Sequence, residues 1–124
     1  MELESLFFDT YALLGVIMGD PGYRRYGERI AIVTTRFNLM EMYYCLLRDY
    51  DKESADRHYD RLRPYALEVS DDVIKEAMEF RLAKKNKKMS YVDCIGYIFA
   101  GHNKIKFLTG DKAFKDLPGV EYVK

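Results

Sequence analysis

Hydrophobic residues follow two alternating patterns along the chain, short apolar runs and longer segments with a helical period. The short runs predict β-strands at residues 3–8, 30–33, 105–108 and 119–123, with a further short candidate at 67–69. The longer segments predict helices at residues 10–18, 23–29, 36–49, 52–65, 71–85 and 91–102, and one helical turn at 111–116. Strands that alternate with helices indicate βαβ units, so the predicted fold class is α/β with a mainly parallel central sheet.

Polar residues at the predicted helix ends support these boundaries. Thr34 or Thr35 can cap the helix over residues 36–49, and Ser70 can cap the helix over residues 71–85. Ser90 opens the last long helix, which is apolar nearly all round and is therefore expected to be buried. Asn103 is expected to end that helix in a left-handed conformation.

Size and charge limit the partners that the chain can have. Its 124 residues match one domain, and its 32% of charged residues balance to a net charge of zero. A neutral protein needs a local basic patch or bridging cations to bind nucleic acid.

The tyrosine-rich stretches 43–44 and 91–97 are interpreted as core or dimer contacts rather than base-stacking surfaces. The candidate RNA-binding residues are Arg36, Lys84, Lys85, Lys87, Lys88 and Lys112, although the neighbouring lysines also fit a solvated loop at a helix end.

Other features exclude whole classes of protein. No apolar run approaches the roughly 18 residues of a membrane-spanning helix, and the acidic start does not resemble a signal peptide. Cys45 and Cys94 lie in apolar stretches and are expected to be reduced core residues, as in a cytoplasmic protein. No Cys or His cluster predicts zinc.

Four carboxylates are the candidates for chemistry. Asp9 and Asp111 directly follow predicted strands, and Asp93 lies in the first turn of the apolar helix. Each of these three also fits a helix cap. Glu41 lies in the middle of a helix, where capping plays no part and a solvated surface position is the alternative.

The joint arrangement of these acids predicts a metal site. Parallel topology brings the carboxyl ends of strands to one edge of the sheet, where ligands of such sheets bind. Two carboxylates about 4 Å apart repel by on the order of 4 kcal/mol at an effective dielectric near 20. Such a cluster therefore persists only when it is protonated, paired with basic groups or loaded with cations. Hard oxygen ligands favour Mg²⁺ or Mn²⁺, which can activate water against a phosphodiester.

These residues resemble the PIN-domain family, and in particular the VapC-like toxins of toxin–antitoxin pairs. Four motifs in order carry the resemblance: Leu6-Phe-Phe-Asp-Thr10, Asn38-Leu-Met-Glu41, Ser90-Tyr-Val-Asp-Cys94 and Leu108-Thr-Gly-Asp-Lys-Ala-Phe114. The resemblance implies an α/β/α sandwich over residues 1–124 and a Mg²⁺- or Mn²⁺-dependent ribonuclease. It further implies Asp9, Glu41, Asp93 and Asp111 as catalytic and metal-binding residues, Thr10 and Thr109 as supporting hydroxyls, and Asp116 as a further supporting acid.

The resemblance also implies partners, which are an RNA substrate, a cognate antitoxin and a second copy of the chain in a homodimer. Three alternatives stay open. The chain can be a housekeeping RNA-processing nuclease of the same family or a catalytically silent binding module. A phosphoacceptor receiver domain is disfavoured, because Asp9 lacks an adjacent acid and no lysine ends the late strand.

Overall fold

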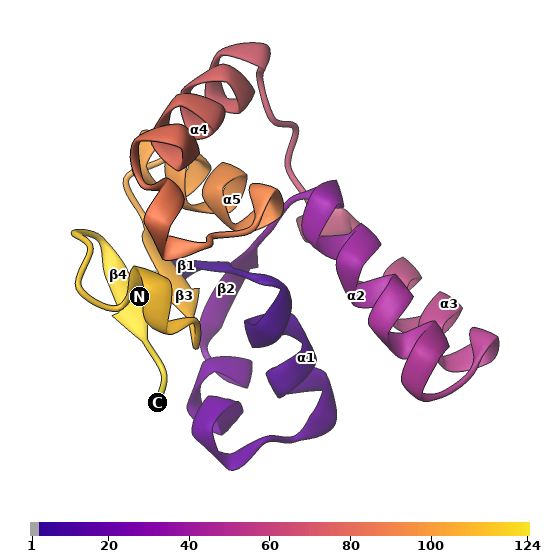
Figure 1. The fold of residues 1–124 in the computed structure, drawn as a ribbon. Helices are drawn as coiled ribbons and strands as arrows, with labels where there is room; N and C mark the ends of the chain where they lie inside the picture. Colours follow the sequence, from indigo (N-terminus) through magenta and orange to yellow (C-terminus); the bar gives the residue numbers. More distant parts are fainter. Residues whose placement is uncertain (1–2) are drawn as a thin grey trace.

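The computed structural model describes residues 3–124, in which four parallel strands form the centre of the fold (Figure 1). Its sheet has the order β2-β1-β3-β4, and all three neighbouring pairs are parallel. The strands are β1 (Glu4–Phe8), β2 (Ile30–Val33), β3 (Lys106–Thr109) and β4 (Val120–Tyr122). The predicted parallel sheet is therefore confirmed, with β1 between β2 and β3.

Within residues 3–124, five α-helices and four short 3-10 helices connect the strands. The α-helices are α1 (Thr10–Met18), α2 (Arg36–Asp49), α3 (Lys52–Leu62), α4 (Asp71–Ala83) and α5 (Tyr91–His102). The 3-10 helices are η1 (Pro21–Gly27), η2 (Arg63–Tyr65), η3 (Lys85–Lys87) and η4 (Lys112–Phe114). The predicted bounds of β2, α1, α2 and α5 agree with the structure at both ends.

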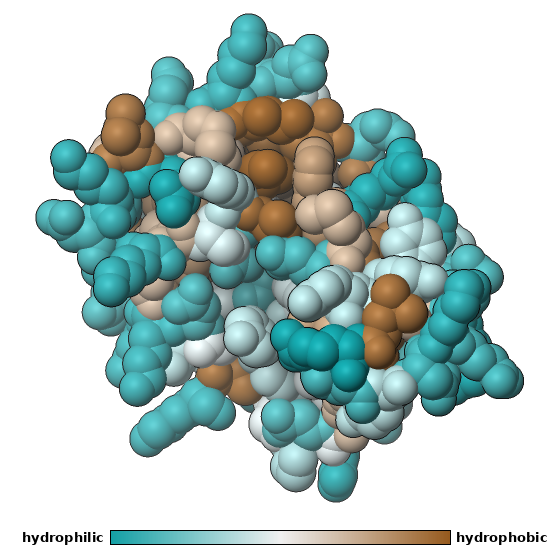
Figure 2. All heavy atoms as spheres, turned by 45° about the vertical axis from the view of Figure 1, so that its right-hand side comes forward, coloured by the Kyte–Doolittle hydropathy of each residue, from teal (hydrophilic) through white to brown (hydrophobic). Residues whose placement is uncertain are grey.

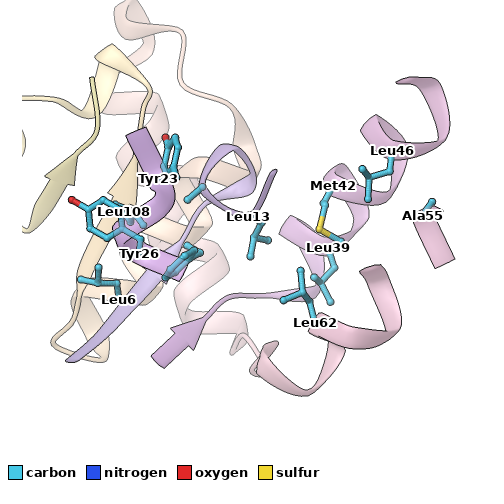
Figure 3. Packing of buried hydrophobic residues seen from close by; sticks show 12 residues of the cluster. Leu6, Leu13, Tyr23, Tyr26, Leu39, Met42, Leu46, Ala55, Leu62 and Leu108 are labelled. Atoms are coloured by element: carbon cyan, nitrogen blue, oxygen red, sulfur yellow. The ribbon is translucent and has the colours of Figure 1, made fainter. Parts of the chain in front are cut away.

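Helices cover both faces of the sheet, because successive side chains of β1 point to opposite sides. Leu6 and Phe8 join a core cluster with α1, η1, α2 and α3. Figure 3 shows Leu39, Met42 and Leu46 of this cluster following one another along α2. Phe7 joins the second cluster, with α4 and α5. The predicted α/β/α sandwich is confirmed, with α4 and α5 together on one side of the strands (Figure 1).

Two local predictions were wrong. Residues 67–69 form no strand, and only an isolated bridge joins Ala66 to Thr34. The pairing stops there because α2 begins at Arg36, directly after its cap Thr35, so the partner chain continues as a helix. Asn103 is not left-handed, since its φ is −94°, and the positive φ of 57° occurs at Lys104. The backbone N–H and side-chain amide of Asn103 both donate to the Phe99 carbonyl, which keeps Asn103 in the last turn.

Two other predicted helices differ from the observed ones, one in its length and one in its position. The segment predicted as one helix over 52–65 is divided into α3 and η2, because Pro64 has no backbone N–H to donate. The short helix predicted at 23–29 is η1, which starts two residues earlier, where Asp20 accepts a hydrogen bond from the N–H of Gly22.

The surface differs from the predictions at one cysteine. Both cysteines are free, but only Cys94 is buried, while Cys45 is partly exposed. Tyr44 and Tyr91 are exposed, so of their two predicted roles, core and dimer contact, only the dimer contact stays a prediction. Figure 2 shows a face on which hydrophobic atoms gather into a patch in its upper half, bordered by hydrophilic atoms. Among residues 3–124, no helix combines the length and the apolar character needed to cross a membrane.

Candidate metal centre

The adjacent strands β1 and β3 end at the same edge of the sheet. Asp9 follows β1, and its N–H donates to the carbonyl of Leu108 in β3 at 3.3 Å. Asp111 follows β3 after Thr109 and Gly110. Glu41 comes from α2 on one face of the sheet, and Asp93 comes from the first turn of α5 on the other face. Both helical layers therefore contribute an acid to this edge.

Asp9 is fully buried and caps α1. Its Oδ1 accepts a hydrogen bond of 2.7 Å from the N–H of Ala12, while its buried Oδ2 has no hydrogen-bond partner within residues 3–124. Burial raises the pKa of Asp9 to about 7, and the charges of Asp93 and Asp111 add to this, against the opposing effects of Thr109 and Ala12. The ionised form of Asp9 therefore lacks a compensating positive charge.

Asp93 is also buried, with 8% of its surface exposed. Burial raises its pKa to about 6, and the negative charges of Glu41 and Asp111 add to the rise, while Ser90 opposes it. Ser90 Oγ accepts a hydrogen bond of 3.0 Å from the N–H of Asp93, so the predicted cap of this helix is present. Asp93 interacts electrostatically with each of the other three acids.

Glu41 is held by a chain of polar side chains. Its Oε1 accepts a hydrogen bond of 2.7 Å from the hydroxyl of Thr10. Thr10 Oγ1 in turn accepts from the side-chain amide of Asn38 at 3.3 Å, and Asn38 Oδ1 accepts from the hydroxyl of Thr35 at 2.7 Å. Thr10, Asn38 and Thr35 are all buried. Glu41 is only partly exposed, which disfavours the alternative of a freely solvated surface residue.

Asp111 is held by short-range hydrogen bonds at the start of η4. Its Oδ1 accepts from the N–H of Ala113 at 2.9 Å, and its own N–H donates to the hydroxyl oxygen of the buried Thr109 at 3.0 Å. Asp116 lies two residues beyond η4 and is exposed. The capping alternative thus describes real contacts of Asp9 and Asp111, but capping alone does not account for the burial of Asp9 or for the mutual repulsion of the acids.

The donor chemistry of this edge fits a divalent cation. All four side chains offer hard carboxylate oxygens, and the unpartnered Oδ2 of Asp9 is available. In the described part of the chain, however, no three Asp, Glu, His or Cys side chains converge closely enough to hold one ion as they stand. The capping bonds of Asp9 and Asp111 and the Thr10 bond of Glu41 fix these carboxylates separately around the edge.

Tyr23 and Asn38 are residues that the sequence analysis did not single out. The Tyr23 ring lies between two glycines, since a Cβ at Gly15 would meet the ring at 2.4 Å and a Cβ at Gly110 would meet the hydroxyl at 2.7 Å. Burial and then the charge of Asp9 raise the pKa of Tyr23. The sequence signal that could have indicated this close packing is the presence of Gly110 directly before Asp111 and of Gly15 in the helix that follows Asp9.

The candidate RNA-binding residues flank the acidic edge along the chain. Lys85, Lys87 and Lys88 are exposed in and after η3, just before the cap of α5. Lys84 is partly exposed, with its Nζ 5.9 Å from the ring centre of Phe80. The remaining two are exposed as well, Arg36 at the start of α2 and Lys112 directly after Asp111.

Comparisons with known proteins agree with this fold. A family model described as PIN domain matches residues 6–120. The solved structure of VapC20 from Mycobacterium tuberculosis, described as a toxin that cleaves the sarcin–ricin loop, has a TM-score of 0.77 and 22% sequence identity, over 96% of this chain and 99% of that chain. A toxin–antitoxin complex from Klebsiella pneumoniae has a TM-score of 0.74 and 19% identity, over 94% and 95% of the two chains.

A third solved structure, VapBC2 from Rickettsia felis bound to a DNA fragment from its promoter, has a TM-score of 0.73 and 17% identity, over 97% of this chain and 99% of that chain. At these identities the likeness concerns the fold. Among curated protein sequences, none matches the chain.

Proposed function

The chain belongs to the PIN domain family, and from this premise we propose that it is a Mg²⁺- or Mn²⁺-dependent endoribonuclease with one nuclease domain over residues 1–124. The reaction adds water across a phosphodiester bond of RNA. The observation that carries the proposal is the burial of Asp9 beside Asp93 and Asp111, with an Oδ2 atom that has no hydrogen-bond partner in residues 3–124. A site with buried, uncompensated carboxylates is expected to bind a cation.

Four residues would hold the cation: Asp9, Glu41, Asp93 and Asp111. A divalent cation bound there lowers the pKa of a water molecule and offsets the charge of the phosphodiester. Thr10 orients the Glu41 carboxylate through its 2.7 Å hydrogen bond. Thr109 fixes the backbone of Asp111 by accepting its N–H at 3.0 Å. Asp116 is proposed as a further acid that acts from the exposed turn after η4.

Basic side chains around this edge are proposed to attract the RNA backbone. The four lysines of residues 84–88 precede α5. Lys112 is the first residue of η4, and Arg36 is the first residue of α2. Each phosphate that such a side chain neutralises releases counterions, so RNA binding should weaken as salt is raised. This arrangement explains how a chain of zero net charge can bind a polyanion.

We further propose that the enzyme is the toxin of a type II toxin–antitoxin system, acts in the cytoplasm, forms a homodimer and is inhibited by a cognate antitoxin. Support comes from the names of similar structures, a toxin–antitoxin complex, VapC20 and VapBC2. Large apolar side chains on the surface, among them Met40 and Leu82, offer contact area for such protein partners.

The decisive experiment measures cleavage of an RNA pool by the purified protein in Mn²⁺ and in EDTA. We expect cleavage that requires Mn²⁺ and disappears in Asp9→Asn and Asp93→Asn. The matched control is Asp51→Asn, because Asp51 is also a capping aspartate but lies at an exposed helix start. Cleavage that persists in EDTA, or that survives both substitutions at full rate, would contradict the metal-dependent nuclease.

A second experiment separates a toxin from a housekeeping nuclease of the same family. Induced expression of the wild-type chain should stop growth, expression of Asp93→Asn should not, and the product of a neighbouring gene should restore growth. Cleavage without toxicity would favour RNA processing. Folded protein that binds a partner but never cleaves would favour the silent binding module.

A further inference from the structure

An apolar cavity opens directly beside Glu41, between the start of α1 and the middle of α2. It has a volume of about 440 Å³. Its lining residues are Thr10, Tyr11, Met40, Glu41, Tyr44 and Cys45. Thr10 and Glu41 are the pair joined by the 2.7 Å hydrogen bond, so the cavity is continuous with the acidic edge.

The cavity walls are exposed aromatic and apolar side chains. Tyr11 is 65% exposed, Tyr44 is 62% exposed and Met40 is 56% exposed. Glu41 is the sole charged residue in its lining, and no basic residue contributes. A phosphate group would therefore meet only repulsion there, whereas an uncharged planar group would find flat aromatic faces.

The neighbouring cavity is lined by charged residues of both signs as well as by apolar ones. It measures about 570 Å³ and shares Thr10, Tyr11 and Cys45 with the first, so Tyr11 stands between the two. Its lining adds the charged residues Asp20, Arg48, Asp49 and Lys124. Arg48 lies 5.8 Å from the ring centre of Tyr44 and pairs with Asp49 at 2.8 Å, and it does not line the cavity beside Glu41. Charged side chains of both signs thus lie on one side of Tyr11, and an apolar recess lies on the other.

We propose that the cavity beside Glu41 is a nucleobase subsite, in which an unpaired base next to the cleaved phosphodiester stacks on Tyr11, with Tyr44 as the second wall. The proposal rests on the ribonuclease function proposed above. Such a subsite selects single-stranded RNA, because bases in an A-form duplex are already stacked and cannot enter a side pocket. Stacking is tolerant of sequence, so the subsite discriminates unpaired from paired RNA rather than one base from another.

Tyr11 provides the sharpest test, because its exposure makes substitution compatible with folding. Tyr11→Leu keeps an apolar side chain and removes the ring, while Tyr11→Phe keeps the ring. The control is Tyr50→Leu, since Tyr50 is 58% exposed at the end of α2 and does not line the cavity. All variants are made in the Asp93→Asn background, so that RNA is bound without being cleaved.

The probe is an unstructured 12-nucleotide RNA with one 2-aminopurine, measured in Mn²⁺ by anisotropy and by fluorescence quenching. We expect Tyr11→Leu to weaken binding about tenfold or more and to remove quenching at one position of the probe. Tyr11→Phe and Tyr50→Leu should stay within about twofold of the parent, because the ring at position 11 is intact in both. The same sequence as a duplex should bind without dependence on Tyr11.

Two outcomes would overturn the subsite. One is equal binding by Tyr11→Leu and its parent, and the other is an equal loss on single and double strands. If Tyr11→Leu made in the chain with Asp93 intact cleaves RNA normally but escapes inhibition by a protein partner, the cavity is a protein-docking site instead. These failures leave the nuclease function standing as long as wild-type cleavage requires Mn²⁺ and Asp93, so the two proposals fail separately.

Discussion

Two helix starts in this molecule use the same capping bond in opposite surroundings. Asp9 caps α1 and accepts a hydrogen bond of 2.7 Å from the N–H of Ala12, three residues later. Asp51 caps α3 and accepts a hydrogen bond of 2.7 Å from the N–H of Ser54, also three residues later. The pKa of Asp51 is lowered by its bonds to Ser54, whereas burial raises the pKa of Asp9 to about 7.

The difference shows that capping does not explain the acidic edge. A backbone N–H that donates to a carboxylate favours its charged form, and this effect decides the outcome at the exposed Asp51. At Asp9 the loss of hydration outweighs the same bond, and the charges of Asp93 and Asp111 add to the penalty. The ionised form of Asp9 therefore requires a compensating positive charge nearby, whereas that of Asp51 does not.

The largest expected effect is on cleavage. Asp9→Asn keeps a good capping residue but removes the charge, so we expect the rate of RNA cleavage in Mn²⁺ to fall by more than about 100-fold. Asp51→Asn makes the same chemical change at the exposed cap and should leave the rate unchanged. Single-turnover cleavage of one RNA substrate measures both, and equal rates for the two variants would remove the distinction between the two caps.

The second expected effect is a pH dependence of the metal-free protein. The ordinary pKa of an aspartate is 3.8, and the folded values of Asp9 and Asp93 are about 7 and 6. Between these limits the folded protein binds more protons than the unfolded chain, so the free energy of unfolding in EDTA should fall as pH rises from 4 to 7. Each group contributes a slope of up to roughly 1.4 kcal/mol per pH unit.

Urea unfolding in EDTA at pH 5, 6, 7 and 8 measures this slope. Asp9→Asn should reduce it and should be at least as stable as wild type at pH 8, because no charge is buried. Asp51 changes the pH dependence in the opposite direction. Because its pKa is lowered in the folded state, its contribution to stability is present at pH values above the ordinary pKa of an aspartate and is lost as pH falls. A strong loss of stability in Asp9→Asn at pH 8 would favour the capping interpretation.

A smaller effect is expected from the hydroxyl that orients Glu41. Thr10→Val removes the hydrogen bond to Glu41 and leaves the Asn38 amide without its acceptor. We expect cleavage to fall by about tenfold, with recovery in Thr10→Ser. The control is Thr34→Val, which removes another buried hydroxyl bond, to the Phe8 carbonyl at 2.9 Å. Both variants should lose stability in thermal melts, but only Thr10→Val should lose activity well below its melting temperature.

The smallest effect is expected at the exposed cap itself. Asp51→Ala removes the bond to Ser54 and should lower the free energy of unfolding by about 1 kcal/mol at neutral pH, without changing cleavage. Urea unfolding of Asp51→Ala beside Asp51→Asn measures how much the capping hydrogen bond by itself contributes to the free energy of unfolding. A loss of cleavage in Asp51→Ala, with the fold intact at the assay temperature, would mean that α3 has a role in the reaction that its position does not indicate.

Local patterns were predicted well because they depend on neighbouring residues. The capping residues Thr35, Ser70 and Ser90 and the helical period between them placed α2, α4 and α5. The order of the four acidic motifs led to the prediction that Asp9, Glu41, Asp93 and Asp111 form one metal site, which stays a prediction. The sequence did not reveal the ring of Tyr23 between Gly15 and Gly110, because these residues meet only after β3 is placed beside β1.

The amino-acid order alone determined the alternation of strands and helices, and with it the parallel sheet and the positions of Asp9 and Asp111 after strand ends. Only the tertiary structure decided that Asp9 is buried and Asp51 is not. Asp9 follows a central strand that has neighbours on both sides and helices over both faces, whereas Asp51 joins two helices at the surface. Hydration depends on everything that surrounds a side chain, and most of those surroundings come from distant parts of the chain.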